Sequence, residues 1–146
     1  MKKRAGYKLI ALLLCFVLAV CGITAALTVG AIRFAYPMKY ENYIEKYSAQ
    51  YDVPKTLLLA VIKTESSFDP KAESSAGALG LTQITPETFH WLQTKTGETL
   101  SDDALSDPET AIRYGALFLG FLLDEFNSAE TAVAAYHAGR GRVNSW

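Results

Sequence analysis

The stretch LLLAVIKTESSFDPKAESSAGALGLTQ, residues 57–83, joins a helical apolar pattern to a glutamate and a run of small residues. One face of the expected helix carries residues at the spacings i, i+3, i+4 and i+7, which are Leu58, Val61, Ile62 and Glu65. The apolar stripe that should pack into a core therefore ends in a carboxyl group. Apolar surroundings favour the uncharged form of a carboxylic acid, and that is the form a general acid needs.

A structural interpretation of Glu65 is also open, because a glutamate at the end of a stripe can reach water or pair with Lys63 or Lys71. The residues that follow favour a functional site. Apart from Leu79, residues 74–80, SSAGALG, carry little side-chain volume, so their backbone can approach a ligand or another surface closely. A plain glycine and serine connection would have a similar composition.

Two motifs, in order along the chain, resemble those of a known family. They are residues 65–86, ESSFDPKAESSAGALGLTQITP, and residues 134–139, AAYHAG. Together they are similar to the lytic transglycosylase SLT domain, which belongs to the goose-lysozyme-like group of peptidoglycan-cleaving enzymes. The resemblance extends over roughly residues 43–146, and the pair of motifs is more specific than either motif alone.

The resemblance implies a mostly α, lysozyme-like fold and a lyase that acts on peptidoglycan glycan strands without a cofactor. In that family a glutamate, matched here by Glu65, protonates the β-1,4 glycosidic oxygen between N-acetylmuramic acid and N-acetylglucosamine. The muramic acetamido group assists, and the same glutamate then takes the proton of the C6 hydroxyl, which closes a 1,6-anhydro ring. Ordinary glycosidases use a second carboxylate, and the motif offers none that is convincing beside Glu65.

The resemblance also implies a set of substrate-binding residues. The matched serine contacts the acetamido group, the glycine admits the glycan, the glutamine lines the groove and the tyrosine lies near the acid. The matched residues are Ser74, Gly80, Gln83 and Tyr136. His137, the residue after the tyrosine, is expected to bind substrate with them. Each has a structural alternative as a turn, cap, core or surface residue, so they are expected to form a site only as a group with the acid.

The chain departs from the family pattern at three positions. Thr82 and Thr85 stand where methionines commonly line the groove, and His137 stands where asparagine is usual. An imidazole titrates near neutral pH and can change the pH response of a site. With His90 as the other histidine, no metal site is expected. The chain also ends soon after the second motif, where family members usually continue, so the sequence leaves a truncated fragment open.

The N-terminal region indicates a membrane anchor. Residues 9–32 contain no charged residue, and about 20 apolar residues are enough to span a bilayer. The basic residues before them, within 1–8, predict a cytoplasmic N-terminus. A cleaved signal peptide usually has a shorter apolar region of about 7–15 residues. A lipoprotein signal around Cys21 is disfavoured by the bulky Val20.

We therefore expect four parts: a cytoplasmic basic flank (1–8), a transmembrane anchor (9–32), a juxtamembrane linker (33–40) and an extracytoplasmic SLT catalytic domain (41–146). Both cysteines lie in the anchor, so the exported part has no disulfide and no thiol nucleophile. Its ten basic and 15 acidic residues leave a net charge of −5. This charge argues against a nucleic-acid partner.

The exported part reads as a series of helices without strands. Helices are expected at 40–50, 54–66, 86–96, from 108 onward and at 129–138, with the uncharged residues 114–123 at the centre of the core. Residues 97–106 are polar and are expected to form a surface loop. Besides a lytic transglycosylase, two alternatives remain: a hydrolytic muramidase on the same fold and a non-catalytic glycan-binding module.

Overall fold

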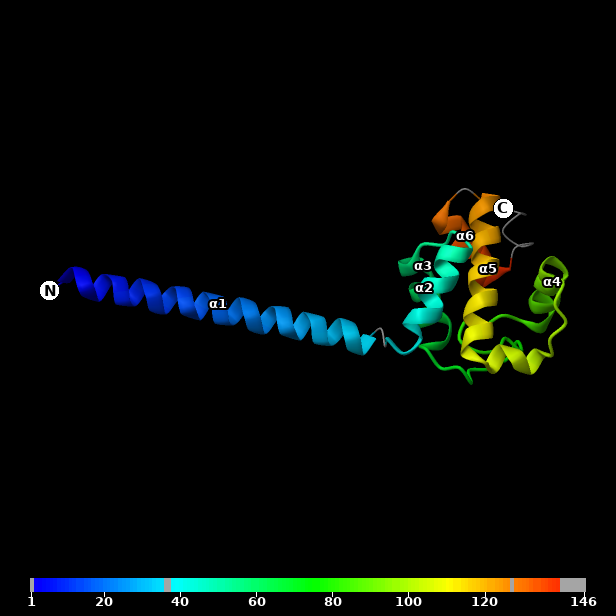
Figure 1. Cartoon of the computed structure of the whole chain (residues 1–146), viewed down its shortest axis with the longest axis horizontal. Helices are drawn as coiled ribbons and strands as arrows, with labels where there is room; N and C mark the ends of the chain where they lie inside the picture. The colour runs from blue at the N-terminus through cyan, green and yellow to red at the C-terminus, as the bar shows by residue number, and fades with distance from the viewer. Residues whose placement is uncertain (1, 36–37, 127, 140–146) are drawn as a thin grey trace. The chain divides into compact units, whose positions relative to one another are not determined.

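The N-terminal unit of the chain is one long helix. The computed structural model describes residues 2–35, 38–126 and 128–139, and the chain divides into a unit of residues 1–38 and a unit of residues 39–146. Helix α1 spans Lys2–Ala35 (Figure 1). Its segment Leu12–Ile32 has a mean hydropathy of 2.6, and this helix is long and apolar enough to cross a membrane.

The boundary of the second unit differs from the expected one. The predicted linker at 33–40 is partly helical, because α1 continues to Ala35 and the 3₁₀ helix η1 spans Met38–Tyr40. Tyr40 is buried in the same core cluster as Ile44. Since a core residue belongs to the folded domain, the domain begins before Tyr40 and not after it.

The second unit is a helical domain. Its further elements are α2 (Glu41–Gln50), α3 (Lys55–Ser66), α4 (Pro86–Thr96), the 3₁₀ helix η2 (Asp102–Ser106), α5 (Pro108–Phe126) and α6 (Ala129–Ala138). The described residues contain isolated β-bridges between α3 and α4 but no named strand. The mostly α fold and the predicted helices are thus confirmed. Residues 140–146, at the end of the expected domain, and Asn127 lie outside the described residues.

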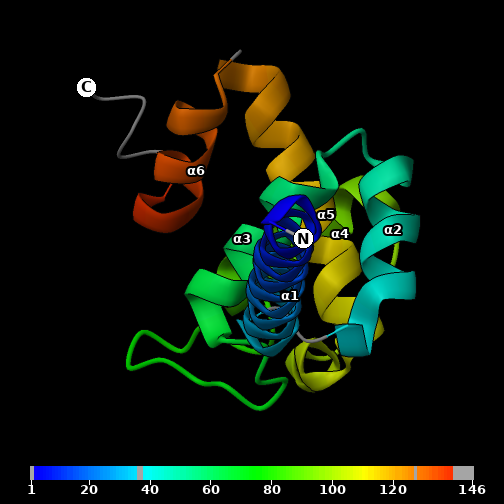
Figure 2. The ribbon, with the colours of Figure 1, turned by 90° about the vertical axis from the view of Figure 1, so that its left-hand side faces the viewer.

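Helix α5 is the centre of the domain, as its uncharged residues 114–123 predict. It contacts α2, α3, α4, α6 and η2, and Figure 2 shows α2 and α6 to either side of it. One core cluster joins α5 to α2 and α3, with Leu58, Ile62 and Leu119 fully buried. The other joins α5 to α4, η2 and α6, with Phe89 and Leu122 fully buried. The α5 helix therefore supplies residues to both halves of the core.

The segment between α4 and α5 does not form the expected surface loop. It contains η2, whose Leu105 is fully buried in the second core cluster. The few apolar residues of this short polar segment give no periodic signal, so the sequence pattern did not indicate the burial of Leu105.

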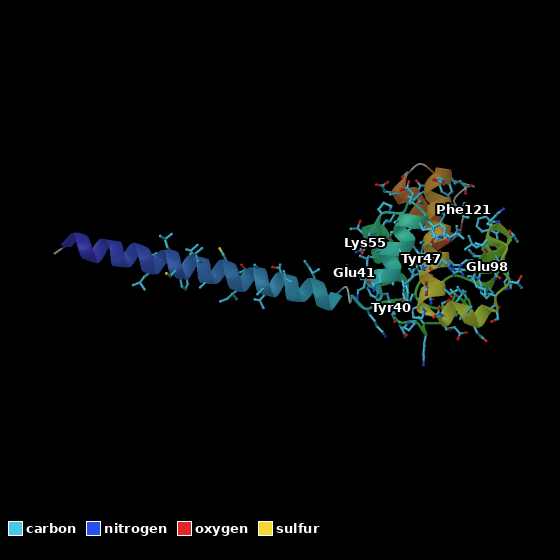
Figure 3. All side chains as sticks on the ribbon, viewed as in Figure 1. Tyr40, Glu41, Tyr47, Lys55, Glu98 and Phe121 are labelled. Atoms are coloured by element: carbon cyan, nitrogen blue, oxygen red, sulfur yellow. The ribbon has the colours of Figure 1, made fainter. Side chains whose placement is uncertain are left out.

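A hydrogen-bonded carboxylate fastens this same segment to α5. The Arg113 guanidinium donates to both Glu98 carboxylate oxygens at 2.7 Å, and the Tyr114 hydroxyl donates to one of them at 2.6 Å (Glu98 is labelled in Figure 3). These hydrogen bonds hold the pKa of Glu98 below its ordinary value, and the bonds from Arg113 have the largest effect. The folded state therefore prefers the ionised form of Glu98.

We expect this carboxylate to make the domain less stable in acid. Because the pKa of Glu98 is lower in the folded state, its contribution to stability is present above the unfolded value of about 4.3 and is lost as pH falls through the folded value. Thermal melts from neutral pH down to about pH 3 should show that Glu98→Gln has a Tm several degrees lower near pH 7. The difference from the unsubstituted protein should shrink in acid, and a difference that is constant with pH would contradict this account.

Candidate active site

The motif residues meet in a cleft. The end of α3, the loop between α3 and α4, and parts of α4, α5 and α6 line a cavity of about 680 Å³. The sequence-predicted residues that line it are Glu65, Ser74, Gln83, Tyr136 and His137. Residues from two motifs far apart in sequence thus face one space, while Gly80 is the predicted site residue that does not line it.

Glu65 lies in the last turn of α3, beyond the apolar stripe. Val61 and Ile62 are buried as the spacing predicts, and Ser67 ends the helix in a left-handed conformation. The Glu65 side chain is 16% exposed, so it is mostly removed from solvent while it still reaches the cleft. Its Oε1 atom lies 3.3 Å from Nδ1 of the exposed His137. The side chain within hydrogen-bonding distance of Glu65 therefore comes from α6 and not from the lysines near it in sequence.

Tyr136 connects α6 to the loop of the first motif. Its hydroxyl donates to the Thr82 carbonyl oxygen at 2.8 Å. Burial is the main cause that raises the pKa of Tyr136, and the nearby Glu65 raises it further. The phenol therefore stays protonated, and its proton is engaged by a backbone carbonyl. Tyr136 positions the loop beside the acid rather than serving as a proton donor.

Thr82 does not line the cleft, although the family residue at its position commonly lines the groove. Its side chain is fully buried, and Oγ1 donates to the Ala111 carbonyl at 2.9 Å. Gly115 of α5 makes this possible, because a Cβ atom there would overlap the Thr82 side chain. Thr85 does line the cleft, where it also accepts the Thr88 N–H as the N-cap of α4.

Ser74 and Gln83 combine a place in the cleft with structural hydrogen bonds. The Ser74 Oγ accepts the Ala78 N–H at 3.0 Å, which closes the turn of small residues. The Gln83 amide nitrogen donates to the carbonyl oxygens of Ala72 and Gly80, both at 3.0 Å. Since the nitrogen is held by the loop, the side-chain oxygen is the atom with which Gln83 can accept a bond from a ligand.

Gly80, which was expected to admit the glycan, does not line the cleft and packs closely against another part of the chain. It is buried with a φ of +72°, and a Cβ atom there would overlap the carbonyl oxygen of Leu105 in η2. The close approach that this glycine allows is to another part of the chain. The small-residue pattern correctly indicated a close approach but not its partner.

The cleft also contains residues that the motifs did not indicate. Trp91 follows Glu87 by four residues and Thr88 by three, so the three share one face of α4, and they line the cleft together with Phe118 of α5. Helical spacing groups the α4 residues, but the sequence does not show that this face meets the acid. Within the part of the chain that the structure describes, no cluster of three or more His, Cys, Asp or Glu side chains suits a metal ion.

Comparisons with known proteins agree on one family. The family model described as "Transglycosylase SLT domain" matches residues 42–146. The soluble lytic murein transglycosylase of Escherichia coli K12 is 34% identical over 114 residues, covering 76% of this chain and 18% of that protein. The membrane-bound lytic murein transglycosylase C of Yersinia pestis is 33% identical over 117 residues, covering 72% of this chain and 32% of that protein.

Solved structures show the same similarity in three dimensions. An inactive glutamate-to-glutamine mutant of the lytic transglycosylase Slt from Pseudomonas aeruginosa superposes with a TM-score of 0.73 at 32% identity, covering 79% of this chain and 19% of that one. The 70 kDa soluble lytic transglycosylase in complex with bulgecin A gives a TM-score of 0.71 at 32% identity, covering 76% and 18%. The chain thus spans about a fifth of these proteins' length.

Proposed function

Because the chain belongs to the transglycosylase SLT-domain family, we propose that its domain is a lytic transglycosylase that cleaves peptidoglycan glycan strands with Glu65 as acid and base. The observation that carries this proposal is the mostly buried Glu65 side chain in the wall of a cleft large enough for sugar rings. The inactive glutamate-to-glutamine mutant of the Pseudomonas aeruginosa relative supports an essential glutamate in this fold.

The proposed reaction begins with protonated Glu65, which donates its proton to the glycosidic oxygen as the bond from that oxygen to C1 of the muramic sugar breaks. The acetamido oxygen of the same sugar stabilises C1 from the opposite side. The Glu65 carboxylate then takes the proton of the C6 hydroxyl, and O6 bonds to C1 to form the 1,6-anhydro ring. The acid ends protonated and no water is consumed, so a single carboxyl group is sufficient.

The other cleft residues have supporting roles in this proposal. Ser74 lies in the small-residue turn and can bond to the acetamido group, and the Gln83 oxygen can accept a sugar hydroxyl. Tyr136 fixes the loop through the Thr82 carbonyl. His137 lies next to Glu65 and is open to solvent, so it is placed to contact the substrate at the mouth of the cleft.

A second candidate, hydrolysis, is favoured by one observation. Glu87 is an exposed carboxylate in the first turn of α4, and it lines the same cleft as Glu65. A second carboxylate is what a water-activating mechanism requires. We prefer the transglycosylase reaction because Glu65 and the loop after it match the family. The two reactions can be separated by their products.

Mass analysis of the muropeptides released from purified peptidoglycan tests this choice. The proposed reaction gives 1,6-anhydro ends, whereas hydrolysis gives reducing ends that are heavier by one water. The Glu87→Gln variant is expected to release the same anhydro products at a rate within about a factor of three, since it removes no group that the mechanism uses. Reducing ends that disappear in Glu87→Gln would instead establish the hydrolase.

We also propose that α1 anchors the domain, with a cytoplasmic N-terminus and the domain outside the membrane. The uncharged segment of α1 and the membrane-bound relatives support the anchor, and the basic residues within 1–8 support the orientation. The variant Ser101→Cys tests this orientation, because Ser101 is exposed on the domain. The natural cysteines lie within the apolar segment and so leave the domain without a competing thiol. A membrane-impermeant maleimide should label Ser101→Cys on spheroplasts but label Lys3→Cys only after lysis. The reverse pattern would contradict this orientation.

A further inference from the structure

Helix α4 presents different residues to the core and to the cleft. Phe89 and Leu92 are fully buried in the second core cluster. Trp91, on another face, is half-buried and lines the cleft. The Trp91 ring packs against the second core cluster and also lines the cleft, so part of its apolar surface is available to a ligand there.

The Trp91 ring is held in place by aromatic neighbours on α5. Phe118 meets it nearly edge-on, with ring centroids 6.3 Å apart and an interplanar angle of 76°. Phe121, labelled in Figure 3, lies 5.6 Å from it at 58°, and the Lys95 ammonium lies 5.6 Å from the ring centroid. A ring that is already fixed loses little conformational freedom when a ligand packs on it.

The same aromatic contacts lead from Trp91 toward the acid. The ring centroids of Phe118 and Tyr136 lie 5.0 Å apart. Tyr136 is in turn close enough to Glu65 for the carboxylate charge to raise the tyrosine pKa. The cleft is thus lined by aromatic rings from α4, α5 and α6. Small side chains, those of Ser74, Ala76 and Ala78, also line the cleft. A cleft with an aromatic wall and a few polar groups suits a ligand with apolar faces and polar edges.

We propose that Trp91, supported by Phe118, forms a sugar-binding subsite that packs against the apolar C–H face of an N-acetylhexosamine ring away from the bond that is cleaved. A β-1,4-linked pyranose has this form, with C–H groups on its faces and hydroxyl groups at its edges. The identity of the glycan rests on the proposed function, but the binding step does not depend on cleavage. Trp91 then makes affinity increase with glycan length and acts on KM more than on kcat.

Binding of β-1,4-linked N-acetylglucosamine oligomers to the full chain in detergent micelles tests the subsite by calorimetry. Chitohexaose is expected to bind about tenfold more weakly to Trp91→Ala, whereas the shorter chitotriose should lose less. Trp91→Phe keeps an aromatic face and should retain most of the affinity. Tyr43→Ala removes a partly exposed tyrosine outside the cleft lining and should bind as the unsubstituted chain does.

Fluorescence gives a second measurement that needs no loss-of-function variant. The chain has two tryptophans, so in Trp146→Phe the emission comes from Trp91 alone. Chitohexaose should shift this emission to shorter wavelength as the sugar displaces water from the indole. An unchanged emission, equal affinity of Trp91→Ala and the unsubstituted chain, or no binding by the latter would overturn the proposal. None of these readouts requires cleavage, so a failure of the catalytic proposal would be seen separately.

Discussion

Replacing Glu65 by glutamine is expected to lower the rate of glycan cleavage by about three orders of magnitude. Glutamine has nearly the same shape but can neither donate a proton to the glycosidic oxygen nor take one from the C6 hydroxyl. Both halves of the proposed reaction therefore lose their proton carrier. The measurement is the release of soluble muropeptides from purified peptidoglycan, compared at equal protein concentration.

The same variant should keep its fold and its affinity for glycan. The Glu65 side chain contacts the exposed His137 at 3.3 Å, so its loss leaves no buried charge without a partner. Chitohexaose affinity and Tm should stay close to those of the unsubstituted chain. Glu73→Gln is a matched control, because Glu73 is an exposed glutamate of the adjacent loop that does not line the cleft. Cleavage at the normal rate by the Glu65 variant would rule out the mechanism.

Gly80→Ala should destabilise the domain by about 3 kcal/mol or more. The added methyl group would overlap the Leu105 carbonyl oxygen, and backbone cannot move aside as a flexible side chain can. The positive φ of +72° at Gly80 adds the usual strain of an alanine in a left-handed conformation. Chemical unfolding followed by circular dichroism measures the change, and muropeptide release should fall with the folded fraction.

Gly97→Ala separates the clash from the backbone strain. Gly97 ends α4 with a φ of +75°, nearly the same as that of Gly80, but a Cβ atom there would meet nothing within 4 Å. Its substitution should therefore cost only about 1 kcal/mol. Equal losses of stability in the two variants would mean that contact with Leu105 contributes nothing and that the packing role of Gly80 is incorrect.

Local patterns in the sequence predicted the helices and the position of Glu65 at the end of a buried helix face. Thr85 and Ser128 cap α4 and α6 by accepting N–H groups three residues later, as capping residues do. Glu65 follows buried residues on the same face of α3, as its spacing indicated. These features depend on residues within a few positions of one another, so a single sequence contains the information that they require.

Features that depend on distant residues were not predictable in the same way. Thr82 is buried because α5 has a glycine where the loop crosses it, and Gly80 is needed because η2 passes close by. Trp91 reaches the cleft because α4 packs beside the aromatic residues of α5. Each of these facts joins segments that are separated along the chain, and only the three-dimensional arrangement brings them together.

The double role of α5 has a consequence for the way the domain melts. Its residues Ile112 and Leu119 belong to one core cluster, and Tyr114 and Leu122 belong to the other. Neither cluster can come apart without exposing apolar surface on the helix that both share, so the two halves should open in one cooperative transition. The acid on α3 and the tyrosine on α6 consequently belong to a single all-or-none unit.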